Sequence, residues 1–284
     1  MGLRMETPDQ LSRRARPWLG TIVEIGVATG QDSAIEAGFA EIARIHHLMS
    51  FHEATSDLAR LRTALAGELV ELARDTVAVL RIAADLHQST NGLFNITVGR
   101  QLVRTNFLPR MDAGHLGRFD GDARDIEIAD DSHVRLHRRV LIDLGGIAKG
   151  YAVDCAVAAL QADGVSRGIV NAGGDLRVFG DVAMPVEVRI AQGGYSAAFA
   201  AENCAVASSE NMRTRRISGG QAATPHIGRD NRPILVDHTV TVIASTCVIA
   251  DAMTKVAMVD PDLADLLLAE HDGQVIRYDL DEAA

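Results

Sequence analysis

Residues 142–154, which read IDLGGIAKGYAVD, carry the pattern that decides the fold. An apolar run ends at Asp143, a glycine pair follows, and a helical pattern begins near Lys149. A strand that turns into a helix at glycines exposes backbone amides that a ligand can approach closely. The segment predicts a strand, a turn and a helix. The turn alone leaves two interpretations open, a ligand site or an ordinary turn with an exposed lysine.

A similar pattern occurs at residues 169–180, IVNAGGDLRVFG, where Gly173 and Gly174 separate two apolar runs and Asp175 follows. Glycine supplies the positive φ of a tight turn and aspartate caps neighbouring amides, so a β-hairpin explains the pattern. Glycines next to a carboxylate also repeat the chemistry of residues 142–154. We therefore predict two strands, joined by a turn that is either structural or part of a ligand site.

The third segment, residues 250–257 (ADAMTKVA), opens a helix after the apolar run 238–245. Asp251, Thr254 and Lys255 are spaced to share one face of that helix. The simplest interpretation is an aspartate at the positive end of the helix dipole, with an ordinary i,i+4 ion pair to the lysine. The alternative is a hard-cation site, because the aspartate, the threonine and a nearby carbonyl supply the oxygens that such ions prefer.

Among the ten histidines, His226 is the strongest functional candidate, because it lies in the polar, irregular stretch TPHIGRDNRP at residues 224–233. Residues 208–234, rich in Arg, Gly, Ser and Asn, predict a long loop, and long loops often carry function. Most other histidines are better explained as surface or half-buried residues.

The remaining hydrophobic periodicity predicts strands and helices without a regular βαβ alternation. Strands are expected at residues 18–28, 125–129, 133–137, 139–144, 186–190 and 238–245, and helices at residues 31–50, 72–90, 147–163, 247–258 and 261–270. We predict a fold of the α/β (α+β mixed) class, with one domain over residues 17–281 after a flexible segment 1–16.

With 47% hydrophobic and 23% charged residues, the 284-residue chain is predicted to be folded throughout. Its net charge of −10 argues against nucleic acid or anionic lipid as partners, so an anionic ligand needs a locally positive site. The three cysteines lack metal-ligand spacing. No signal-peptide pattern and no apolar run of membrane-helix length is present, which predicts a cytoplasmic location without a membrane span.

Eight short segments in collinear order resemble the ApbE-like family of FAD:protein FMN transferases, over residues 17–259. They are LGT (19–21), MSFHEATSDLARL (49–61), GLFNITVG (92–99), IDLGGIAKGYAVD (142–154), IVNAGGDLRVFG (169–180), AVASSE (205–210), HIGRDNRP (226–233) and IADAMTKVA (249–257). Each segment is weak alone, but the shared order is highly specific.

The resemblance implies a single T-fold-like domain that binds FAD, with Mg²⁺, or else Mn²⁺, at the FAD pyrophosphate. The metal would be held by the side chains of Asp251 and Thr254 and by the Gly146 carbonyl, with Lys255 beside it. The residues implied to hold or border FAD are Leu19, Phe51, Asn106, Phe107, Leu108, Asp143, Lys149, Gly173, Gly174, Asp175, His226 and Ile227.

In the implied reaction, a threonine hydroxyl of an acceptor protein attacks the FMN phosphorus of FAD, and AMP leaves. The metal would neutralise the developing charge, which makes Asp251 catalytic, and His226 or a neighbouring carboxylate would take the hydroxyl proton. Two other functions would use the same residues. One is a metal-dependent FAD pyrophosphatase that yields FMN and AMP, and the other is a non-catalytic FAD-binding protein.

Two departures from the family pattern bear on activity. The family usually has threonine four residues after the metal-binding aspartate, where this chain has Lys255, and the segment after its histidine differs from residues 228–230 here. A lysine beside the metal either repels the ion or contacts a phosphate oxygen. We predict that Lys255 points away from the metal and that Thr254 is the hydroxyl ligand.

Overall fold

The computed structural model describes residues 11–188 and 199–278. Contacts within the chain divide it into two compact units. The sheet unit comprises Met1–His46, Ile147–Glu210 and Asp237–Ala284, and the inserted unit comprises His47–Gly146 and Asn211–Val236. The prediction of one domain over residues 17–281 stays a prediction.

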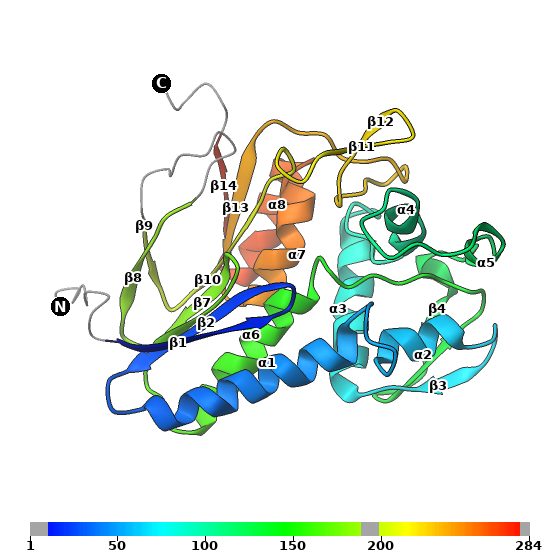
Figure 1. Ribbon diagram of the computed structural model, residues 1–284. Coiled ribbons are helices and arrows are strands. Elements are labelled where there is room, and N and C mark those ends of the chain that lie inside the picture. The colour runs from blue at the N-terminus through cyan, green and yellow to red at the C-terminus, as the bar shows by residue number, and fades with distance from the viewer. Residues whose placement is uncertain (1–10, 189–198, 279–284) are drawn as a thin grey trace. The chain divides into compact units, whose positions relative to one another are not determined.

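The sheet unit is built on a seven-stranded antiparallel sheet (Figure 1). Its strands, in spatial order, are β1 (Leu11–Trp18), β2 (Thr21–Ala28), β6 (Gly168–Ala172), β7 (Asp175–Phe179), β10 (Ala205–Ser209), β13 (Thr239–Ala244) and β14 (Gln274–Tyr278). A separate two-stranded antiparallel sheet consists of β8 (Ala183–Val186) and β9 (Phe199–Glu202). The helices are α1 (Ile35–Met49), α6 (Ala148–Ala162), α7 (Cys247–Ala257) and α8 (Pro261–Leu268).

Apolar packing holds the layers of the sheet unit together. Successive side chains of a strand point to opposite faces of the sheet. Strands β8 and β9 contribute to one apolar cluster, whose buried members are Leu11, Ile169, Leu176, Val178, Val182, Met184, Val186, Ala201 and Val206. Helices α6 and α7 lie side by side and also pack on strands of the sheet (Figure 1). The starts of the two helices meet where Gly150 of α6 approaches the Cys247 carbonyl of α7.

Most elements predicted for the sheet unit are confirmed. The strands predicted at residues 18–28 and 238–245 contain β2 and β13, and the helices predicted at residues 31–50, 147–163 and 247–258 contain α1, α6 and α7. The predicted hairpin at residues 169–180 is formed by β6 and β7. Part of the strand predicted at residues 186–190 lies outside the described residues.

The flexible segment predicted at residues 1–16 needs a correction. Strand β1 pairs with β2 along its whole length, from Leu11 opposite Ala28 to Trp18 opposite Thr21. The arginine-rich sequence of β1 hid this strand, because an edge strand exposed to solvent shows no strong apolar alternation. Residues 1–10 lie outside the described residues.

Apart from the 16-residue helix α3, the elements of the inserted unit are short. They are α2 (Asp57–Thr63), β3 (Leu69–Glu71), α3 (Arg74–Ser89), α4 (Gly99–Arg104), α5 (Ala113–Leu116), β4 (Ile126–Ile128), β5 (His133–Leu136), β11 (Arg216–Ser218) and β12 (Gln221–Ala223). Strands β3, β5 and β4 form one antiparallel sheet in that order, and β11 pairs with β12. Buried Asp57 joins α2 to α3, because it accepts hydrogen bonds from the Ala73 amide (2.9 Å) and the Thr76 hydroxyl (2.6 Å).

Two predictions in the inserted unit are wrong or incomplete. Residues 139–144 form no strand; instead, the Leu141 carbonyl accepts from the Gly99 amide (3.1 Å) and the Asp143 amide donates to the Ile96 carbonyl (2.9 Å). The strand-like pattern arose because this apolar run is buried, not because it has a partner strand. The loop predicted at residues 208–234 contains the β11–β12 hairpin.

The mixed α/β class is confirmed, since helices pack on antiparallel sheets. Over residues 11–188 and 199–278, every helix falls short of the length and apolar character needed to cross a membrane.

Candidate functional site

Four charged residues of the sheet unit form what we call the lysine–aspartate cluster. Lys149 lies in the first turn of α6, Asp175 begins β7, and Asp251 and Lys255 lie on α7. Lys149 is ion-paired with Asp175, Lys255 is ion-paired with Asp251, and the Lys149 Nζ lies 4.0 Å from the Asp251 Oδ2. The cluster therefore links two helices and a strand through alternating charges.

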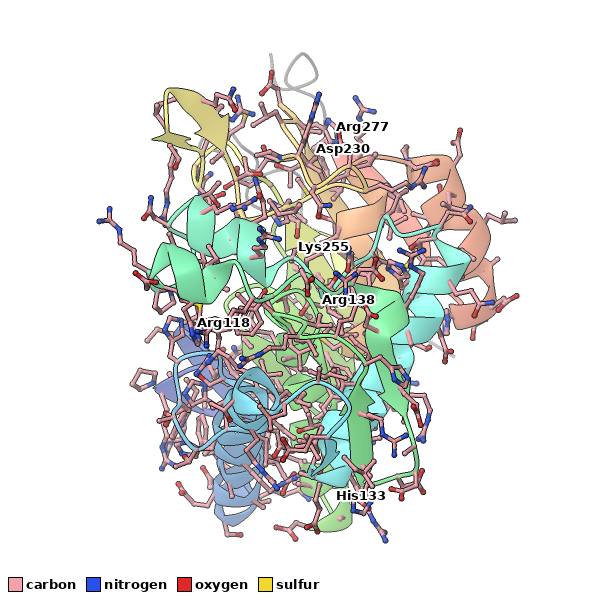
Figure 2. All side chains as sticks on the ribbon, turned by 90° about the vertical axis from the view of Figure 1, so that its right-hand side faces the viewer. Arg118, His133, Arg138, Asp230, Lys255 and Arg277 are labelled. Carbon is pink, nitrogen blue, oxygen red and sulfur yellow. The ribbon has the colours of Figure 1, made fainter. Side chains whose placement is uncertain are left out.

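Exposure in this cluster differs between the two signs of charge. The side chains of Asp175 and Asp251 are 6% and 0% exposed, whereas those of Lys149 and Lys255 are 30% and 18% exposed. The carboxylates are thus buried and the lysines lie toward solvent. Lys255, labelled in Figure 2, is the one residue of α7 that is not buried. An anion approaching from solvent would meet lysine first.

A close contact between helices positions Asp251. A Cβ at Gly150 of α6 would overlap the Cys247 carbonyl of α7, so glycine is required for the two backbones to approach this closely. The same approach lets the Gly150 amide donate to the Asp251 Oδ2 (3.2 Å). The glycine of the GYAVD motif therefore has a packing role that also serves the candidate site.

Asp154, which the sequence analysis assigned no role, fixes the start of α7. Its carboxylate accepts from the amides of Cys247 (3.0 Å) and Val248 (2.8 Å), and from the Arg177 guanidinium (2.7 Å). A carboxylate at free helix amides also complements the helix dipole. Burial raises the pKa of Asp154, while these donors oppose that rise. Its position at the end of the IDLGGIAKGYAVD motif was the available signal.

The charges of the lysine–aspartate cluster perturb each other. Burial lowers the pKa of Lys149, although the Asp251 carboxylate opposes this change and the Lys255 ammonium adds to it. Burial alone would raise the pKa of Asp251, but the nearby ammonium groups of Lys149 and Lys255 outweigh it and leave this pKa lowered. With two lysines and two aspartates, the formal charges of the cluster cancel.

The backbone conformation of the turn between β6 and β7 requires its glycines. Gly173 and Gly174 have φ values of +68° and +110°, and a Cβ at Gly173 would overlap the Thr21 side chain. The Gly174 amide donates to the Asn171 side chain (2.8 Å). Leu19, in the turn between β1 and β2, also has a positive φ of 55°. These features are those of structural turns, and the predicted FAD contacts of these residues stay predictions.

In the inserted unit, the structure brings several predicted FAD residues into one apolar cluster. Buried Phe51, Leu108 and Ile227 belong to this cluster, and partly buried Phe107 packs against it. The Arg62 guanidinium lies 4.7 Å from the centre of the Phe51 ring. These residues are far apart in sequence, so their grouping is a structural finding that fits an aromatic ligand but does not require one.

Hydrogen bonds hold the loop around Asn106 and the loop around His226. Asn106 has a φ of +61°, and its carbonyl accepts from Arg216 (2.8 Å), whose guanidinium lies 4.1 Å from the Phe107 ring centre. The His226 carbonyl accepts from the Ile234 amide (2.8 Å), which closes a tight loop over residues 226–234. His226 therefore lies at the start of a loop that a backbone hydrogen bond closes.

Asp143 and Gly146 lie at the end of the first segment of the inserted unit. Burial raises the pKa of Asp143, while the Gly145 amide, 3.2 Å from the Asp143 Oδ2, opposes that rise. Gly146 belongs to the inserted unit, whereas Asp251, Thr254 and Lys255 belong to the sheet unit. The predicted metal ligands are therefore divided between the two units.

The residues of α7 do not fit a divalent cation as they stand. The Lys255 ammonium group donates one hydrogen bond to the Asp251 Oδ1 and another to the Asp251 carbonyl (2.8 Å). The Thr254 hydroxyl donates to that same carbonyl (2.7 Å) and bonds with the Ser209 hydroxyl (2.8 Å). Among the described residues, no three His, Cys, Asp or Glu side chains are grouped to hold a metal. The prediction that Lys255 points away from this position is wrong; the ordinary i,i+4 pair is present.

The fold and the cluster define a mixed α/β protein in which two lysines and two aspartates lie together on α6, α7 and a strand of the sheet. The chain belongs to the ApbE family, whose sequence model matches residues 19–277. The resemblance carried by the eight collinear segments is confirmed.

Curated relatives and a solved structure agree with this family. The FAD:protein FMN transferase of Vibrio cholerae serotype O1 is 24% identical over 292 residues, which cover 93% of this chain and 86% of the relative. The FAD:protein FMN transferase of Rhodobacter capsulatus is 30% identical over 179 residues, which cover 57% of this chain and 34% of that relative. The crystal structure of the ApbE protein from Thermotoga maritima has a TM-score of 0.82 at 25% identity, with 94% of both chains covered.

Proposed function

We propose that the protein is an FAD:protein FMN transferase, which moves FMN from FAD to a threonine of an acceptor protein and releases AMP. Two relatives of this chain carry that activity in their names. The observation that carries the proposal is the lysine–aspartate cluster. It places two partly exposed ammonium groups over buried carboxylates in a protein of net charge −10.

Lys149 is the residue we assign to the FAD pyrophosphate. The buried Asp175 carboxylate holds its ammonium group, and the side chain is still 30% exposed. A preorganised cation needs little rearrangement when negative charge develops on phosphate oxygens, which is the main way proteins stabilise phosphoryl transfer. Burial lowers the pKa of Lys149, and an anion beside its ammonium group would oppose that change.

The threonine hydroxyl of the acceptor must lose its proton when it attacks the FMN phosphorus. His226 was predicted for this step, and it remains our proposal for the base. Phe51, Leu108 and Ile227 are proposed to contact the ring systems of FAD, because they already belong to one packed apolar cluster in the inserted unit.

The deciding experiment incubates the protein with FAD and a peptide that carries a flavinylation sequence. A transferase adds the mass of FMN to the peptide and releases AMP in equal amount. An FAD pyrophosphatase releases free FMN and AMP whether or not the peptide is present. A non-catalytic binding protein leaves FAD intact, and either of these last two results would replace the proposed function.

A further inference from the structure

We propose that the ammonium group of Lys255 takes the place of the divalent cation implied by the family resemblance, so that this chain binds the FAD pyrophosphate without a metal ion. The identity of the ligand rests on the proposed function. The role of Lys255 rests on the contacts of Asp251.

The first argument is that the oxygen atoms of Asp251 already accept hydrogen bonds within the protein. A small divalent cation needs several oxygens in a near-octahedral shell. The Asp251 Oδ1 is taken by Lys255, and the Asp251 carbonyl accepts from both Lys255 (2.8 Å) and Thr254 (2.7 Å). The Asp251 Oδ2 accepts from the Gly150 amide (3.2 Å). A metal at the Asp251 Oδ1 would have to displace Lys255, and a metal at the Oδ2 would lie beside the Gly150 amide and the Lys149 ammonium group.

The second argument is charge. Any cation on Asp251 would have two ammonium groups as neighbours, because Lys255 contacts Asp251 and the Lys149 Nζ lies 4.0 Å from the Asp251 Oδ2. The two lysines already balance Asp175 and Asp251, so a divalent ion would leave two excess positive charges in a largely buried cluster. Repulsion between like charges is strong where water is scarce.

The third argument is the donor count of Lys255. An ammonium group carries three N–H donors. Two acceptors are found for it among the described residues, both on Asp251. One N–H remains for a ligand, and the side chain is 18% exposed in a helix whose other residues are all buried. A lysine held in this way is a fixed positive charge that can donate to a phosphate oxygen.

Direct metal titration tests the inference without any turnover. Mn²⁺ is added to FAD-free protein and its binding is followed by electron paramagnetic resonance. We expect no saturable site in the wild type. Lys255→Thr should gain one, with an apparent Mn²⁺ affinity at least about tenfold higher than that of the wild type, because the change removes a competing charge and adds an oxygen. The double variant Lys255→Thr, Asp251→Asn should lose this site again.

A parallel FAD titration by calorimetry tests the phosphate contact. Wild-type affinity should be the same in EDTA and in Mg²⁺. Lys255→Met, which keeps most of the unbranched side chain and removes the charge, should bind FAD about tenfold more weakly in EDTA, as expected for a lost charge-assisted hydrogen bond. Melting curves of each variant show whether it is folded.

Three results would overturn the inference: saturable Mn²⁺ binding in the wild type that Asp251→Asn removes, wild-type FAD affinity that rises with Mg²⁺, or no gain of Mn²⁺ binding in Lys255→Thr. The first two need no variant of Lys255 and decide the matter even if those variants do not fold. Failure of the wild type to bind FAD under either condition would instead reject the proposed function, while the Mn²⁺ titrations would still report on Lys255.

Discussion

The candidate residues of the sheet unit and those of the inserted unit are held by different forces. In the sheet unit, Lys149 and Asp251 are fixed by ion pairs and amide donors that join separate elements. In the inserted unit, Phe51, Leu108 and Ile227 are fixed by apolar packing. The candidate residues of the sheet unit are thus charged, and those of the inserted unit are apolar. The sheet unit should therefore respond to loss of charge, and the inserted unit to loss of packing.

The largest effect expected from this contrast is that of Asp251→Ala. The change removes the carboxylate that lies beside the ammonium groups of Lys149 and Lys255. Removing one member of a buried ion pair costs about 3–5 kcal/mol of unfolding free energy. Partial exposure of the lysines should reduce the loss of unfolding free energy to about 3 kcal/mol. Urea denaturation measures it. Asp251→Asn, which keeps the shape, should lose less, and an unchanged midpoint for Asp251→Ala would show that the pair carries no net stability.

A slightly smaller effect is expected for Gly150→Ala, which tests the close approach of α6 and α7. The added Cβ would overlap the Cys247 carbonyl, and forced overpacking costs about 1–3 kcal/mol. Gly117→Ala in the inserted unit is the matched control, because its nearest neighbour would be the Ala113 carbonyl at 3.4 Å. Thermal melts should show a clear loss for the first variant only. Equal stability of both would mean that the helices separate at little cost.

Local sequence patterns predicted what depends on neighbouring residues and missed what depends on distant ones. The turn at Gly173 and Gly174 and the helix after Gly146 were predictable, because glycine pairs punctuate apolar runs. Asp154 was not, since the amides it caps lie 93 and 94 residues further along the chain. Spacing offered the i,i+4 pair of Asp251 and Lys255 as the simplest interpretation, but it could not say which cation Asp251 prefers.

A pH titration separates charge from packing in the same comparison. The pKa of Asp251 is lowered in the folded state, so its contribution to stability is present above the ordinary value of 3.8 and is lost as pH falls through the lower folded value. The unfolding free energy of the wild type should therefore fall on acidification below pH 3.8 more steeply than that of Asp251→Asn. Parallel curves for the two proteins would assign the acid sensitivity to other carboxylates.

The smallest effect expected is that of Arg216→Gln, compared with Arg16→Gln. Each arginine covers an aromatic ring, at 4.1 Å from the Phe107 centre in the inserted unit and at 4.5 Å from the Phe39 centre in the sheet unit. Phe39 is only 1% exposed and is held by its core neighbours, whereas Phe107 is partly buried and depends more on the arginine above it.

Loss of an exposed cation–π contact costs about 0.5–1 kcal/mol, so Arg216→Gln should lower the unfolding free energy by at least that amount, since its hydrogen bond to the Asn106 carbonyl is removed as well. Arg16→Gln should change it less, because packing alone keeps the Phe39 ring in place. Urea denaturation of both variants, with Arg216→Lys to retain the positive charge, measures the difference. A larger loss for Arg16→Gln would mean that arginine stacking matters as much in the sheet unit as in the inserted unit, and the contrast between ion pairs and packing would then be incomplete.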